Sequence, residues 1–60
     1  MRFTIYQNEH DVHVFDDDFG YDASLRIGGD FATAEERYAY AQAVANALNK
    51  AEEDIPRGPP

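Results

Sequence analysis

Seven acidic residues between Glu9 and Asp30 are the side chains of this 60-residue chain with the clearest chemical potential. They are Glu9, Asp11, Asp16, Asp17, Asp18, Asp22 and Asp30. Three consecutive aspartates repel one another, and a turn needs only one or two. Carboxylates spaced over a rigid surface present negative charge much as the phosphates of DNA do. The pattern therefore favours a surface that binds basic side chains of a partner, and the alternative is a solvated turn.

The same stretch is a poor match to a metal site. An EF-hand loop counted from Asp16 needs Gly at its sixth position and Glu at its twelfth, where this chain has Tyr21 and Ile27. His10 and His13 are three residues apart, which places them on opposite faces of a strand. We therefore expect no bound metal and no cofactor.

Catalytic groups are equally sparse. The chain has no cysteine, and its one serine, Ser24, lies inside a predicted strand. No nucleophile, base and orienting group are set up together, and a chain of this length has little room for a pocket that excludes water. We expect no enzymatic activity.

Three short segments alternate between apolar and other side chains, as half-buried strands do. They span residues 2–8, 11–16 and 23–28, separated by a polar link and by an Asp-rich turn over residues 16–22. Short polar links of this kind join antiparallel neighbours. One face of the resulting meander carries the predicted core, namely Phe3, Ile5, Val12, Val14, Leu25 and Ile27.

Residues Thr33 to Asp54 form the one long periodic run and predict an amphipathic helix. Thr33 and Glu36 have the spacing of a capping box, and Pro56 favours an end at Ile55. With Val44 at its centre, the predicted apolar stripe holds Tyr40, Ala41, Ala47, Leu48, Ala51 and Ile55. Alanines in this stripe let the helix lie close to the sheet.

These elements predict a single α+β domain over residues 1–55, in which a three-stranded antiparallel meander is followed by one C-terminal helix on a sheet face (β-β-β-α). Residues 56–60 are rich in Pro and Gly and predict a disordered tail. The opposite sheet face stays uncovered and carries Tyr6, His13 and Phe15. Three ring side chains on one open face predict a second contact patch.

Twelve acids against five bases give a formal net charge of −7. Direct nucleic-acid binding needs a basic surface, so we expect none, and anionic membranes are disfavoured for the same reason. No apolar run approaches the ~20 residues of a membrane span. The first residues, MRFTIYQNEHD, lack the apolar region of a signal peptide. A cytoplasmic, monomeric protein with a basic partner is the expectation.

Two features resemble known proteins. The run FATAEERYAYAQAVANALNKAEE resembles the C-terminal helix of small bacteriophage accessory proteins. The whole chain, which is small, cysteine-free and strongly acidic with an Asp-rich turn, is similar to the DNA-mimic class of anti-CRISPR proteins. Phages use that class to block the CRISPR surveillance complex of a bacterial host. The resemblance implies a partner subunit whose basic groove reads the protospacer-adjacent motif.

Two hypotheses follow for function. The first is a non-enzymatic inhibitor that binds a host nucleic-acid-binding protein through Asp16, Asp17, Asp18 and Asp22, with Glu9, Asp11 and Asp30 in support. Neutralising residues 16–18 should then leave folding unchanged or improve it, because repulsion is relieved. The alternative is a small interaction module that forms a homodimer through the Tyr6, His13 and Phe15 face, with the charge serving solubility.

Overall fold

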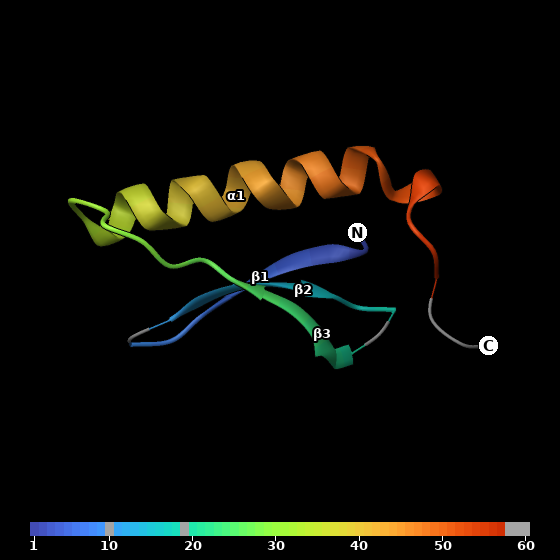
Figure 1. The fold of residues 1–60 in the computed structure, drawn as a ribbon, viewed down its shortest axis with the longest axis horizontal. Coiled ribbons are helices and arrows are strands. Elements are labelled where there is room, and N and C mark those ends of the chain that lie inside the picture. Colours follow the sequence, from blue (N-terminus) through green and yellow to red (C-terminus); the bar gives the residue numbers. More distant parts are fainter. Residues whose placement is uncertain (10, 19, 58–60) are drawn as a thin grey trace.

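A computed structural model of the chain describes residues 1–9, 11–18 and 20–57, with the backbone alone for residues 20–23. Three strands are followed by one helix and a short 3-10 turn: β1 (Phe3–Gln7), β2 (Val12–Asp16), β3 (Gly20–Arg26), α1 (Ala34–Lys50) and η1 (Glu52–Asp54). The strands form one antiparallel sheet in the order β1-β2-β3. The helix covers one face of this sheet (Figure 1). The predicted α+β fold is confirmed.

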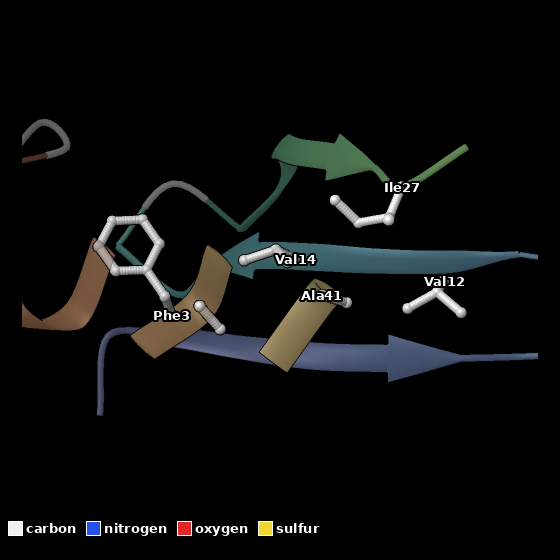
Figure 2. Packing of buried hydrophobic residues seen from close by; sticks show 6 residues of the cluster. Phe3, Val12, Val14, Ile27 and Ala41 are labelled. Atoms are coloured by element: carbon white, nitrogen blue, oxygen red, sulfur yellow. The ribbon is translucent and has the colours of Figure 1, made fainter. Parts of the chain in front are cut away.

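The core lies between α1 and the sheet. Val14 is almost completely buried at its centre (Figure 2). Around it lie Phe3 from β1, Val12 from the same strand and Ile27, which directly follows β3. Ile5 is half-buried at the edge of the same cluster. Strand pairing explains this grouping, because Ile5 lies opposite Val14 in the β1–β2 register, and facing residues of an antiparallel pair share a sheet face.

The turn between β2 and β3 is shorter than the sequence predicts. β3 begins at Gly20, although the expected strand began at residue 23, and the ladder shifts register between Phe15 and Asp16. The backbone N–H of Asp18 donates to Asp16 Oδ1 at 3.0 Å. An aspartate that accepts from the residue two positions on closes a tight turn by itself, so the strand can resume at once.

Helix α1 begins at the predicted cap. Thr33 Oγ1 accepts a hydrogen bond from the Glu36 N–H at 3.1 Å. The Glu36 carboxylate reaches back to the N–H of Ala32, one residue before the cap, at 3.2 Å. The α-helix ends at Lys50, and the predicted last turn continues as the 3-10 turn η1. Tightening into a 3-10 turn is a common way to end a helix.

The buried stripe of α1 differs from the predicted one. Ala41 and Ala45 are the fully buried helix positions, whereas Tyr40 is 57% exposed and Ala47 and Ala51 are also exposed. On a helix of 3.6 residues per turn, Ala41 lies about 60° from Val44, the predicted centre. The helix is rotated so that its smallest side chains meet the sheet, which brings the two backbones close together. The predicted stripe members Val44, Leu48 and Ile55 pack at its margin.

Leu25 was wrongly assigned to the core. It lies opposite Val14 in the β2–β3 register and therefore shares the helix-facing side of the sheet. It is nevertheless 51% exposed, because α1 packs against β1 and β2 and leaves β3 uncovered. Alternation along a strand assigns a residue to a face but does not say how much of that face a single helix covers.

We expect Leu25→Thr to change the free energy of unfolding by about 0.5 kcal/mol or less, because an exposed strand position is not part of the core. Val14→Thr, on the directly opposite residue, is the matched comparison and should be clearly destabilising, since it buries a hydroxyl. Urea denaturation of both variants measures the difference. Equal losses would mean that the helix covers β3 in solution.

Candidate protein-interaction surfaces

An ion pair inside the fold removes one predicted contact residue from the surface. Arg2 Nε donates to Asp16 Oδ1 and Arg2 Nη2 to Asp16 Oδ2, both at 2.8 Å. Only 5% of Arg2 and 7% of Asp16 are exposed. Parallel bidentate bonds of this kind are among the strongest side-chain contacts. Asp16 is therefore a structural residue, and the expectation that it contacts a partner is corrected.

Arg2 lowers the pKa of the Asp16 carboxyl below its ordinary value. The main cause is the hydrogen bond from the guanidinium, and the backbone N–H of Asp18 adds to it against the opposing effect of burial. A depressed pKa means that the folded state favours the ionised carboxylate. The folded protein therefore keeps the Asp16 carboxylate ionised at a lower pH than a free aspartate would allow.

Arg2 also holds the C-terminal segment. Its Nη1 donates to the carbonyl oxygens of Ile55 at 3.0 Å and Glu52 at 3.4 Å, and its Nη2 donates to that of Pro56 at 2.6 Å. The predicted disordered tail starts at Pro56, but in the structure this residue is bound to Arg2. Residues 58–60 lie outside the described part of the chain. One buried guanidinium thus ties the strand-connecting turn to the end of the helix.

A second arginine bridges two acidic elements at the same end of the molecule. Arg57 Nη1 lies 2.9 Å from Asp18 Oδ2, and Arg57 Nη2 lies 4.0 Å from Glu52 Oε2. The Asp-rich turn and η1 therefore stand side by side, next to both described chain ends (Figure 1). We call this surface the acidic end; its exposed or half-exposed acids are Asp17, Asp18, Glu52, Glu53 and Asp54.

The other predicted acids lie elsewhere. Glu9 and Asp11 belong to the link between β1 and β2, which lies at the same end of the molecule as the helix N-terminus (Figure 1). Asp30 belongs to the segment between β3 and α1. The Asp11 carboxylate accepts from Arg26 Nε at 2.9 Å. The side chain of Asp22 lies outside the described residues, although its backbone belongs to β3. The predicted set is thus divided between two ends of the fold.

The predicted ring cluster is assembled on the open sheet face. The Tyr6 and Phe15 rings meet edge to face at 5.6 Å between centroids, and His13 stacks on Phe15 at 5.9 Å. Tyr6 is half-exposed. His13 Nδ1 is buried without a hydrogen-bond partner among the described residues. The face is a compact aromatic patch with one unsatisfied polar atom.

Two other kinds of site are absent from the described part of the chain. No group of three or more His, Cys, Asp or Glu side chains there is arranged to hold a metal ion. No helix within these residues is long and apolar enough to cross a bilayer.

Sequence reasoning missed Arg2, and its set of contact residues did not include the acids of η1. A signal was present, since Arg2 is the only arginine or lysine before Arg26 and the run of aspartates needs a counter-charge. What the pattern cannot specify is which carboxylate of the run turns inward. Asn49, whose side chain bonds the backbone of Phe3, was also missed.

Comparison of the chain with known protein families, with curated proteins and with solved structures found no match in any of the three.

Proposed function

We propose that this chain is a non-enzymatic inhibitor that occupies the basic groove of a nucleic-acid-binding protein, with its acidic end in the place of phosphates. The observation that carries the proposal is the approach of the Asp-rich turn to η1, where one guanidinium reaches both Asp18 and Glu52. Two acidic rows on a rigid support imitate the two charged strands of a duplex better than one flexible loop does.

The charge at this end remains negative after internal pairing. Asp17, Glu53 and Asp54 are exposed, and no arginine lies close enough to pair with them among the described ion pairs. The Arg57 side chain is 63% exposed, so its contact with Asp18 is a surface ion pair of small net value. An arginine or lysine of the partner can replace Arg57 at little cost.

The resemblance to DNA-mimic anti-CRISPR proteins indicates which target to test first. It is the subunit of a CRISPR surveillance complex that reads the protospacer-adjacent motif. Such a groove is lined by basic side chains that bind phosphates. The same side chains would bind the negative carboxylates of the acidic end. The chain then blocks target DNA by competition and needs no chemistry of its own.

We expect a triple variant of the acidic end, Asp17→Asn with Glu53→Gln and Asp54→Asn, to inhibit target-DNA binding by the surveillance complex at least about tenfold more weakly. The three side chains are exposed, so folding should be retained. Inhibition by the wild type should weaken as salt rises from about 0.1 M to 1 M, because the Debye length falls from about 10 Å to 3 Å. Competition measurements with labelled target DNA give both results.

The matched control removes three charges from the opposite end, with Glu9→Gln, Asp30→Asn and Glu35→Gln. It should inhibit nearly as well as the wild type. Equal weakening by the two triple variants would show that only net charge matters and that the acidic end is not the contact. A mobility shift of duplex DNA by the protein alone would count against mimicry altogether.

The aromatic patch supports a second candidate function, a homodimeric interaction module. The contacts of Phe15 with both other rings favour it, because clustered aromatic side chains are typical of interface centres. This candidate predicts that Phe15→Ser abolishes self-association, and that measurement is included in the experiment below.

A further inference from the structure

The outer edge of β1 is chemically unlike the outer edge of β3. The β1 sequence, FTIYQ, contains no charged residue and no proline, whereas β3, GYDASLR, contains Asp22 and Arg26. Proteins commonly protect exposed sheet edges with charge or proline, because unpaired backbone groups recruit another strand. By this criterion the sequence of β3 protects its edge from pairing with another strand, and the sequence of β1 does not.

One end of the β1 edge is closed by a helix side chain. The Phe3 N–H donates to Asn49 Oδ1 at 2.8 Å, and Asn49 Nδ2 donates to the Phe3 carbonyl at 2.9 Å. A side-chain amide thus makes the two bonds that a neighbouring strand would make. Because backbone groups alternate along a strand, Ile5 and Gln7 point outward as Phe3 does. The bonds from the Asp17 N–H to the Arg2 carbonyl and from the Asn8 N–H to the Asp11 carbonyl confirm that even-numbered residues face β2.

The outward groups of Ile5 and Gln7 are therefore open. No hydrogen bond to them is found within residues 1–9, 11–18 and 20–57. Two shallow hollows that share Tyr38 flank them, one lined by Gln7, Ala34 and Ala39 and the other by Ile5, Gln42 and Asn49. The edge thus offers two N–H groups and two carbonyls beside a recess.

We propose that this edge pairs with β1 of a second copy of the chain, antiparallel about a two-fold axis at Tyr6. In that register Ile5 of each copy lies opposite Gln7 of the other, and the pair exchanges four backbone hydrogen bonds. All open groups are used and none is left over, while Phe3 keeps its bonds to Asn49. A two-fold axis at Ile5 would instead require Phe3 to leave Asn49.

The position of α1 fits this pairing. The helix packs over both β1 and β2, so its axis lies above the gap between them, about half a strand spacing from β1 on the side away from the open edge. With strands about 4.8 Å apart, the two helices come to lie about 10 Å from each other on the same face. Helices in contact pack at 8–10 Å. Tyr38, which is 41% exposed beside the recess, would then be covered by the second helix.

The two acidic ends do not meet in this arrangement. The acidic end lies at the start of β1, near Phe3, and an antiparallel two-fold pair places the two acidic ends at opposite extremes. The paired strands themselves carry no charge. The two Tyr6 side chains meet across the axis, where facing residues stand about 4.5–5.5 Å apart. The second copy therefore gains apolar contact at Tyr6 and keeps the two acidic ends apart, although Glu9 of each copy lies opposite Phe3 of the other in this register.

The wild-type protein tests this directly. Sedimentation velocity over a dilution series should show a monomer–dimer equilibrium, and amide NMR spectra should show Ile5 and Gln7 shifting on dilution more than Ser24. Gln7→Pro removes an outward N–H that the monomer does not use, as proline is tolerated at sheet edges. It should weaken association about tenfold or more, since two backbone hydrogen bonds are lost per dimer.

Ser24→Pro is the matched control, because Ser24 is an exposed position on the outer edge of β3. It should leave association unchanged. A monomer at every concentration would overturn the proposal, as would a dimer that tolerates Gln7→Pro. A dimer lost only in Phe15→Ser would instead assign the interface to the aromatic patch. None of these results depends on the inhibition described above, so this proposal and the proposed function can fail separately.

Discussion

Asp16→Asn is expected to destabilise the protein more than the loss of any other carboxylate, enough to leave part of the population unfolded without denaturant. The substitution removes one of the two acceptors that Arg2 bonds at 2.8 Å and takes away its closest counter-charge, leaving only the Asp18 carboxylate at 3.5 Å. Removing one partner of a buried pair costs far more than the intact pair contributes. A domain of this size has little stability to lose. Urea denaturation followed by circular dichroism measures the shift in midpoint.

Asp17→Asn is the control for this prediction, since it removes the same charge from the adjacent, exposed position. It should be neutral or slightly stabilising, because repulsion within the turn is relieved. The earlier expectation that neutralising residues 16–18 together preserves the fold is thereby revised: we expect Asp17 to tolerate the change and Asp16 not to. Asp18, which lies 3.5 Å from Arg2 and 2.9 Å from Arg57, should show a smaller loss than Asp16. A stable Asp16→Asn variant would show that Arg2 finds another partner.

Acid provides a second measurement of the same pair. The folded-state pKa of Asp16 is depressed below the unfolded value of about 4. The stability from the pair is therefore complete above the unfolded pKa and is lost as the pH falls through the lower, folded pKa. Wild-type stability should decline as the pH drops below about 4, and this part of the decline should be absent from Asp16→Asn. An identical pH dependence in both proteins would contradict the assignment.

Phe3→Ala is expected to cost about 3–5 kcal/mol, the usual range for deleting a buried ring. Phe3 is a member of the buried cluster, and its ring also lies beneath the Arg2 guanidinium at 5.1 Å. The variant therefore loses core volume and the surface on which Arg2 rests. A loss of this size is most of the total free energy of unfolding expected for a 60-residue domain. The expected outcome is therefore loss of cooperative thermal unfolding.

Phe3→Leu is the matched control, because it keeps an apolar side chain at the site and should retain a cooperative transition at lower temperature. The comparison separates the cavity from the hydrogen bonds between Asn49 and the Phe3 backbone, which both variants keep. A loss below about 0.5 kcal/mol in Phe3→Ala would place Phe3 outside the core in solution.

The candidate surfaces show where sequence patterns stop being informative. The ring cluster could be predicted because side chains alternate between the two faces of a strand, and this alternation is a local property. It places Tyr6, His13 and Phe15 of two paired strands on the sheet face away from the helix. The acidic end could be predicted only in part. Composition identifies a charged turn, but the inward rotation of Asp16 depends on Arg2, which is 14 positions away in the chain.

Local periodicity alone determined the main features of the fold. The two-residue alternation of three segments, the helical run after Thr33 and the presence of a turn between successive strands are each set by neighbouring residues, so they can be read without coordinates. The same is true of the net charge and the absence of cysteine. The length of the second turn could not be read in this way, since β3 begins at Gly20.

Tertiary structure alone decided which parts of those elements are covered. Helix α1 lies over β1 and β2, where the Asn49 side chain bonds the Phe3 backbone, and this position exposes Leu25 and buries Ala45. The contacts of Arg2 with Ile55 and of Asn49 with Phe3 join positions 53 and 46 residues apart. Such pairings arise from the path of the whole chain, because no local pattern carries information about residues that meet only after folding.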